Sequence, residues 1–267
     1  MRDRVVVITG ASSGIGAALA VLVGEKGARP VLVARREREL NEVAARSGPH
    51  ALALVADVTR RADVERVVAV TIARAGHIDV WINNAGRGIT RSVAELTDDD
   101  FDEMMRVNVK SALYGMQAVL PHFKTRRRGH LINVSSVLGR VPIAPVRSAY
   151  SAAKHALNSL TANLRMDLRA AFPDIHVTTV LPGVVATDFG VKALGGGPDS
   201  RALPGAQPVE EVAEVIARVI EEPRADVYTR PVYRELVARY FGAEDLGAVE
   251  GQPPFVQAPV SPKPPAT

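Results

Sequence analysis

The sequence predicts an α/β protein in which a doubly wound parallel sheet carries helices on both faces, in a single domain. Two observations favour this fold class. Short apolar runs alternate with longer amphipathic stretches along most of the 267 residues. Continuous apolar runs are typical of strands that are buried on both faces, and a regular strand–helix alternation indicates a parallel sheet. We find no internal repeat.

The elements are expected in the following order. Seven apolar runs are expected strands, at 4–9, 30–34, 51–56, 78–83, 129–135, 175–181 and, more weakly, 225–229. Six stretches with apolar residues at helical spacing are expected helices, at 14–27, 36–46, 61–75, 98–125, 148–171 and 208–222.

Two regions break this alternation. Residues 188–208 are rich in Gly and Pro and long for an α/β connection, so they are either functional or disordered. Residues 251–267 form a proline-rich stretch that cannot build a core. We therefore expect a folded domain over 1–250 and a flexible tail over 251–267.

The composition excludes several classes of site. Cysteine is absent, so disulfides, cysteine zinc sites and thiol nucleophiles are excluded. The six histidines lack metal-ligand spacing, and we expect no metal site. Lys and Arg number 33 against 29 for Asp and Glu, a net charge of +4. The basic cluster at 126–128 has no interleaved aromatic residues, so we interpret it as a solvated loop and not as a nucleic-acid contact.

The sequence favours a protein outside the membrane. The apolar run near the N-terminus stops at Thr9-Gly10 and is too short for the core of a signal peptide. No run reaches the roughly 18 apolar residues that a membrane helix needs. We expect a cytoplasmic protein with no membrane or nucleic-acid partner.

A glycine-rich motif, TGASSGIG at 9–16, follows the first strand and opens the first helix. Its glycines, Gly10, Gly14 and Gly16, allow a tight turn and close approach of a ligand. The exposed N–H groups and the dipole at the start of the helix favour a phosphate. In a parallel α/β chain this motif predicts a Rossmann-like dinucleotide site, with a plain glycine-rich turn as the alternative.

The end of the second strand carries Arg35 and Arg36 where an NAD site would carry an acid. Two guanidinium groups suit the 2′-phosphate of NADP. We therefore expect NADP(H), with NAD(H) as the weaker alternative, and Arg35 as the main phosphate contact. The competing interpretation is that both arginines merely begin a charged helix.

Further motifs make the chain resemble the classical short-chain dehydrogenase/reductase family over roughly residues 4–230. They are Asp57-Val58 after the third strand, NNAG at 83–86, Asn108, NVSS at 133–136, the YxxxK pair Tyr150 and Lys154, and PGVVAT at 182–187. The resemblance implies a catalytic tetrad of Asn108, Ser136, Tyr150 and Lys154. Together with the arginines, the expected cofactor-binding residues are Gly10, Ser12, Ser13, Gly14, Ile15, Gly16, Arg35, Arg36, Asp57, Val58, Asn84, Ala85, Gly86, Tyr150, Lys154, Pro182, Gly183, Val185 and Thr187.

Tyr150 and Lys154 are four residues apart, so on a helix they share one face. A free tyrosine has a pKa near about 10, and a neighbouring cation lowers the pKa by stabilising the phenolate. Tyr150 can then transfer a proton, while a serine hydroxyl holds the carbonyl oxygen. The resemblance implies that Asn108 anchors a proton-relay water. Ser136 lies 14 positions before Tyr150, one more than is usual in the family, so Ser135 remains the alternative catalytic serine.

The motifs predict an NADP(H)-dependent oxidoreductase that interconverts a carbonyl group and a secondary alcohol. The alternatives are a catalytically silent NADP-binding regulator and an NAD-dependent alcohol dehydrogenase. An extended-type epimerase or dehydratase is disfavoured, because the chain lacks room for a further substrate domain. By the resemblance, residues after PGVVAT shape the substrate site, and four apolar side chains there favour a hydrophobic substrate: Phe189, Val191, Leu194 and Leu203.

The resemblance also implies a homo-oligomer, a tetramer or dimer, in which the helices at 98–125 and 148–171 pair between subunits. Both helices carry more apolar residues than one stripe needs, among them Met104, Met105, Leu113, Met116, Leu157, Leu160 and Leu164.

Overall fold

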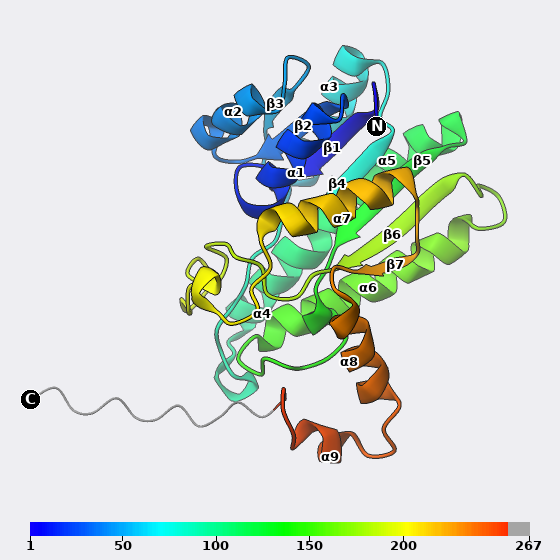
Figure 1. Ribbon diagram of the computed structural model, residues 1–267. Coiled ribbons are helices and arrows are strands. Elements are labelled where there is room, and N and C mark those ends of the chain that lie inside the picture. The colour runs from blue at the N-terminus through cyan, green and yellow to red at the C-terminus, as the bar shows by residue number, and fades with distance from the viewer. Residues whose placement is uncertain (256–267) are drawn as a thin grey trace, which may run out of the picture.

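The computed structural model describes residues 1–255, and these contain a seven-stranded sheet with the order β3-β2-β1-β4-β5-β6-β7 (Figure 1). Every neighbouring pair is parallel. The strands are β1 (Val5–Thr9), β2 (Arg29–Ala34), β3 (Leu52–Val55), β4 (Val80–Asn83), β5 (Gly129–Val134), β6 (Ile175–Leu181) and β7 (Asp226–Tyr228). The predicted Rossmann-like fold class is confirmed.

Helices cover both faces of the sheet (Figure 1). On one face α1 (Gly14–Glu25), α2 (Glu37–Arg46) and α7 (Val209–Glu221) bury side chains such as Leu19, Leu40 and Ile216. On the other face lie α3 (Arg61–Ala75), α5 (Ser111–Arg126) and α6 (Ser148–Leu168). All five residues of β1 are buried, which is why this strand reads as an uninterrupted apolar run.

The stretch predicted as one helix at 98–125 is interrupted. It consists of α4 (Asp98–Met105), a π-helical turn η2 (Arg106–Lys110) and α5. Thr97 and Asp100 form a capping box at the start of α4. A π-helical turn inserts an extra residue within a continuous helix, and such turns are frequent at functional sites.

Two helices that the sequence pattern did not predict follow β7. They are α8 (Pro231–Phe241) and α9 (Leu246–Glu250). Tyr240 is the only fully buried residue of α8, so the helix has no continuous apolar stripe to reveal it. Tyr240 stacks on Phe255 at 5.3 Å, beside Val137 and Val141. The division into a domain over 1–250 and a tail stays a prediction, and residues 256–267 of that tail lie outside the described residues.

The strand order reverses between β1 and β4, the usual place for a ligand crevice in an open α/β sheet. Thr9 ties the ends of these strands together. Its hydroxyl accepts hydrogen bonds from the N–H groups of Asn84 (2.9 Å) and Ala85 (3.1 Å) and donates to the carbonyl of Ile82 (3.2 Å). The two turns that carry the TGASSGIG and NNAG motifs are therefore held side by side.

Some apolar residues that were expected at a subunit interface belong to the core of the subunit. Met104, Met116 and Leu157 are at most 3% exposed and pack inside the fold. Leu113, Leu160 and Leu164 are partly buried against the same core. Packing within the subunit therefore explains part of the excess of apolar residues on these helices, and contact with a second subunit is not needed for that part. In residues 1–255 no helix is both long and apolar enough to span a bilayer.

Candidate active site

The glycine loop forms one wall of the crevice. Gly10 and Gly14 have positive φ values of 68° and 56°. A Cβ atom on Gly10 would lie 2.8 Å from the Cα of Ala85, and one on Gly16 would lie 2.6 Å from the Gly10 carbonyl oxygen. The Ser13 side chain does not cap α1, so in the described chain the first N–H groups of this helix stay available for a phosphate. This cradle fits a dinucleotide.

The two arginines after β2 point to different places. Arg36 Nη2 donates to Ser12 Oγ at 2.9 Å and to Ser13 Oγ at 2.8 Å. Arg35 is exposed, and its positive charge acts on Asp57. The residue that the structure brings to the glycine loop is therefore Arg36, whereas the sequence argument favoured Arg35.

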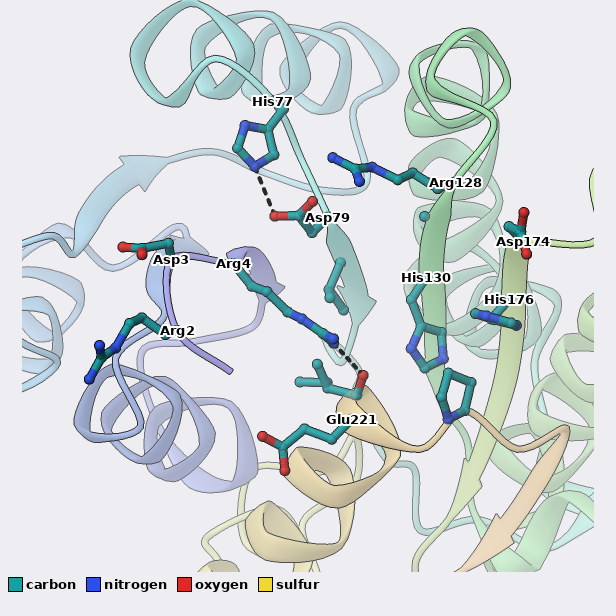
Figure 2. Close-up of a pocket in the computed structure, with 14 residues that line it drawn as sticks. Arg2, Asp3, Arg4, His77, Asp79, Arg128, His130, Asp174, His176 and Glu221 are labelled. Carbon is teal, nitrogen blue, oxygen red and sulfur yellow. Dashed lines mark hydrogen bonds and ion pairs between the residues drawn. The ribbon is translucent and has the colours of Figure 1, made fainter.

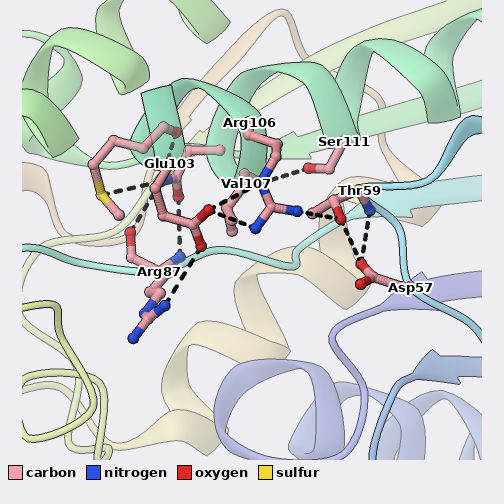
Figure 3. A network of polar contacts seen from close by, with 9 residues as sticks. Asp57, Thr59, Arg87, Glu103, Arg106, Val107 and Ser111 are labelled. Atoms are coloured by element: carbon pink, nitrogen blue, oxygen red, sulfur yellow. Dashed lines mark hydrogen bonds and ion pairs between the residues drawn. The ribbon is translucent and has the colours of Figure 1, made fainter. Parts of the chain in front are cut away.

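Asp57, after β3, is the first member of a polar network that reaches η2 (Figure 3). Burial raises the pKa of Asp57, but hydrogen bonds from the Thr59 N–H (3.0 Å) and hydroxyl (2.8 Å), with the charges of Arg35 and Arg106, outweigh it and hold the pKa below its usual value. Arg106 donates to Thr59 Oγ1 at 2.6 Å and to Glu103 at 2.9 Å. Val58 packs against the core beside Asp57.

Asn108 lies in η2 and is 1% exposed. Its Nδ2 donates to the carbonyls of Arg87 (2.9 Å) and Met104 (3.1 Å), and its Oδ1 accepts from the Arg87 N–H (3.1 Å). A Cβ atom on Gly86 would lie 3.0 Å from Asn108 Oδ1 and 3.8 Å from Lys154 Nζ. Asn108 and Lys154 thus converge on the NNAG turn.

Ser136 and not Ser135 lies beside Tyr150. Ser136 begins a short 3₁₀ turn, η3 (Val137–Gly139), and its hydroxyl accepts from the Leu138 N–H at 3.1 Å. Hydrogen bonding from the same side chain lowers the pKa of Tyr150. The Ser135 hydroxyl instead lies 3.4 Å from the Lys154 carbonyl.

Tyr150 and Lys154 are both buried on the inner face of α6, at 8% and 3% exposed. Lys154 Nζ donates to the Val134 carbonyl at 3.0 Å and lies 5.6 Å from the centre of the Tyr150 ring. Burial lowers the pKa of Lys154 to about 8. Burial raises the pKa of Tyr150 to about 12, although Ser136 and Arg147 act to lower it.

The expectation that Lys154 lowers the pKa of Tyr150 is not met in this structure: Lys154 is not among the groups that shift this pKa, and burial raises it above its ordinary value. A phenol with a pKa near 12 is protonated at neutral pH and holds the proton that a carbonyl oxygen needs.

The PGVVAT segment lies beside the glycine loop. Thr187 faces the glycine loop, because a Cβ atom on Gly14 would lie 3.3 Å from its Cγ2. The Pro182 carbonyl accepts from the Val137 N–H at 2.8 Å, and Val185 pairs with Gln207. Gly183 lies against the Tyr233 ring of α8, which leaves no room for a Cβ atom.

Two further side chains border Tyr150. The edge of the Phe189 ring meets the Tyr150 ring at 5.5 Å. Arg147 lies three residues before Tyr150 and acts on its pKa. The sequence argument did not single out Arg147. The pattern that could have indicated Arg147 is its position three residues before Tyr150 at the start of a helix, a spacing that places two side chains on one helix face.

A hollow of about 670 Å³ lies at the other edge of the sheet, where the strands begin (Figure 2). His77 contacts Asp79 at 2.9 Å, and Arg4 donates to the Ile220 carbonyl at 2.7 Å. Burial lowers the pKa of His130 to about 3, so this histidine is neutral, and it contacts Thr178 at 2.8 Å. The motifs expected to bind a dinucleotide all lie at the opposite edge, so this hollow is not the candidate active site.

Within residues 1–255 no cluster of His, Asp and Glu could hold a metal ion.

Known proteins resemble the chain in sequence and in structure. An uncharacterised oxidoreductase of Staphylococcus epidermidis is 36% identical over 196 residues, 71% of this chain and 84% of that protein. An alcohol dehydrogenase of Thermococcus sibiricus, solved with 5-hydroxy-NADP, has 28% identity and a TM-score of 0.74, with 87% of this chain and 98% of that chain covered. A 3-ketoacyl-(acyl-carrier-protein) reductase of Brucella melitensis, solved with NADH, has 27% identity and a TM-score of 0.77, with 85% and 96% covered.

The family model described as short chain dehydrogenase matches residues 4–194. This match spans the glycine loop, the NNAG turn, Asn108, Ser136, Tyr150, Lys154 and Thr187, and it confirms the resemblance seen in the sequence. The chain belongs to the short-chain dehydrogenase family, and it is an oxidoreductase.

Proposed function

We propose that the protein is an NADP(H)-dependent oxidoreductase that interconverts a carbonyl group and a secondary alcohol. The observation that carries this proposal is the buried group of Ser136, Tyr150 and Lys154 beside a crevice that fits a dinucleotide. The tetrad residues and the cofactor-binding residues keep the roles expected from the sequence, except that Arg36 replaces Arg35 as the main contact of the 2′-phosphate.

The side chains divide the reaction between them. A nicotinamide nucleotide held by the glycine loop and the NNAG turn would supply the hydride for the carbonyl carbon. Ser136 and Tyr150 hold the carbonyl oxygen, and the Tyr150 O–H proton moves to this oxygen, so that C=O becomes CH–OH. The Lys154 ammonium offsets the phenolate charge that remains. Oxidation of the alcohol runs through the same groups in reverse.

Two features support a hydrophobic substrate and NADP. Phe189 and Leu194 pack in the apolar cluster that contains Tyr150, so the substrate side of the site has an apolar lining. Arg36, Ser12 and Ser13 form a positively charged group with hydrogen-bond donors at the glycine loop, and this group suits the 2′-phosphate of NADP. The two solved relatives carry different nicotinamide cofactors, so the preference of this chain is argued from its own arginines.

A catalytically silent NADP-binding regulator would need the cofactor-binding residues but would not need Tyr150 to transfer a proton. Replacing Tyr150 by Phe therefore tests the proposal. We expect turnover to fall about a hundredfold or more, because proton transfer is lost, while the dissociation constant for NADPH stays within about twofold of wild type. Initial rates of NADPH oxidation with a ketone panel and a fluorescence titration measure the two effects.

Tyr114→Phe on α5 is the matched control for Tyr150→Phe, because its ring packs under Arg61, away from the crevice, and it should keep full activity. Activity of Tyr150→Phe within a few-fold of wild type would rule out the assigned proton donor.

Lys154→Met should abolish turnover and make the free protein more stable at pH 7, by about 2 kcal/mol, because burial of the ammonium group is relieved and one hydrogen bond to Val134 is lost. The pKa of Lys154 is lower in the folded state, about 8, than its ordinary 10.5. Between these values the unfolded chain binds more protons, so the wild type gains stability as pH rises. The advantage of Lys154→Met should therefore be largest at pH 7 and shrink above pH 8.

Urea unfolding at pH 7 and pH 9.5 measures this difference in free energy. Lys110→Met removes an exposed lysine and should show no such pH-dependent gain. A Lys154→Met protein that is less stable than wild type at pH 7 would show that burial does not penalise this ammonium group.

The cofactor preference should depend on Arg36. A charge-assisted hydrogen bond is worth about 1.5–3 kcal/mol, and about 1.4 kcal/mol is tenfold. We expect Arg36→Ser to lower kcat/KM for NADPH at least about tenfold, with NADH changed less than about twofold, and Arg35→Ser to have a smaller effect. Arg38→Ser on the same helix removes an arginine that is 82% exposed, and serves as control.

Wild-type protein that uses NADH as well as NADPH would contradict the cofactor proposal. The same holds if the Arg35 and Arg36 variants both keep the preference for NADPH.

We also propose a homo-oligomer, a tetramer or dimer. Met166 on α6 is 72% exposed and Phe101 on α4 is 43% exposed, so apolar surface remains for a partner. Multi-angle light scattering at micromolar concentration should give a mass of two or four chains, and a monomer alone would contradict this. The cytoplasmic location stays a prediction from the sequence.

A further inference from the structure

Arg147 lies among three segments that surround Tyr150. It directly precedes α6, so its side chain and that of Tyr150 share one helix face. Its Nη1 donates to the Ile89 carbonyl at 3.1 Å. A Cβ atom on Gly88 would lie 3.2 Å from Nη1, and one on Gly197 would lie 3.2 Å from Nη2. The guanidinium group is therefore held between the turn after β4 and the loop at 188–208.

The charge of Arg147 has no counter-ion in the protein as far as residues 1–255 show. Other arginines differ in this respect, because Arg91, Arg140 and Arg201 each contact a carboxylate at 2.7 Å. A guanidinium group has five N–H donors, and the one hydrogen bond to Ile89 leaves most of them for another acceptor. A half-buried, unpaired cation is costly unless a ligand supplies the missing charge.

The surroundings indicate which kind of anion fits. The backbones of Gly88 and Gly197 pack against the guanidinium group, and because Arg147 is only half-buried, a small planar group can approach the part that stays exposed. A single guanidinium matches one carboxylate in a bidentate pair. Phe189 and Leu194 line the same side of Tyr150 and leave the remainder of the ligand in apolar surroundings.

We propose that Arg147 binds a carboxylate of the substrate, so that this enzyme acts on oxo acids or the corresponding hydroxy acids. The proposal rests on the function proposed above and narrows its substrate class. The hydrophobic substrate then consists of an apolar body, a reacting carbonyl held at Ser136 and Tyr150, and a carboxylate held at Arg147.

Two other roles of Arg147 make different predictions. Arg147 acts on the pKa of Tyr150, and its bond to Ile89 joins two loops. Loss of either effect would lower turnover of charged and uncharged substrates alike. Loss of a carboxylate contact would affect charged substrates alone.

The test compares three oxo acids with their uncharged methyl esters, because the spacing between carbonyl and carboxylate then varies. The probes are 2-oxobutanoate, 3-oxobutanoate and 4-oxopentanoate, with cyclohexanone as a neutral ketone. We expect wild type to prefer at least one acid over its ester. Arg147→Gln should lower kcat/KM for that acid at least about tenfold more than it lowers kcat/KM for the ester, and the additional loss should lie mainly in KM.

Arg147→Lys keeps the charge without the planar fork and should retain part of the preference for the acid. Arg128→Gln is the charge-matched control, since this exposed arginine lies at the other edge of the sheet (Figure 2). Thermal unfolding of each variant checks that the fold is kept.

Equal losses for acid and ester in Arg147→Gln, unchanged acid turnover, or a wild type that prefers esters or cyclohexanone would overturn the inference and leave the proposed function standing. A wild type that turns over none of the carbonyl compounds with NADPH or NADH would contradict the proposed function and the inference together.

Discussion

Burial of Tyr150 and Lys154 on one face of α6 is the constraint on which the architecture of the site depends. Within residues 1–255 no carboxylate shifts the pKa of either group. The cost of burial is offset at Lys154 by the hydrogen bond to the Val134 carbonyl, and at Tyr150 by hydrogen bonding with Ser136 and by the charge of Arg147. The Lys154 ammonium needs the Val134 carbonyl, which fixes the end of β5 against α6. The Tyr150 phenol needs Ser136, which the short turn after β5 presents. A neutral tyrosine and a lysine with a lowered pKa follow directly from this packing.

The same constraint links Asn108 and Lys154 to the NNAG turn and the glycine loop. Gly86 leaves the space in which Asn108 and Lys154 approach the NNAG turn, and any larger residue there would meet Asn108. Asn108 holds both backbone groups of Arg87, and the π-helical turn places it there. Thr9 then fastens this turn to the glycine loop across the reversal in strand order. Asn108, Lys154, the NNAG turn and the glycine loop are therefore joined by one connected set of contacts.

The sequence predicted the sheet and the order of the motifs because each has a local signature. Strands buried on both faces read as apolar runs, and Tyr150 and Lys154 show their shared face through the i, i+4 spacing. Features that depend on three-dimensional packing escaped prediction. The π-helical turn in α4–α5 leaves the apolar periodicity almost unchanged, and α8 buries only Tyr240 fully. Which of Arg35 and Arg36 reaches Ser12 and Ser13 depends on side-chain direction after β2. The balance between burial and charge at Tyr150 requires knowing how completely α6 covers it.

The most direct test of the role of burial at this site is a measurement of the pKa of Tyr150 in the free enzyme. A difference titration of tyrosinate absorbance, wild type against Tyr150→Phe, isolates the one phenol from the four other tyrosines. The structure predicts a pKa near 12, above the ordinary 10.0, because burial of the phenol outweighs the favourable contacts with Ser136 and Arg147. A Tyr150 pKa at or below 10 in the free enzyme would show that charge and not burial governs the site, and would contradict the account.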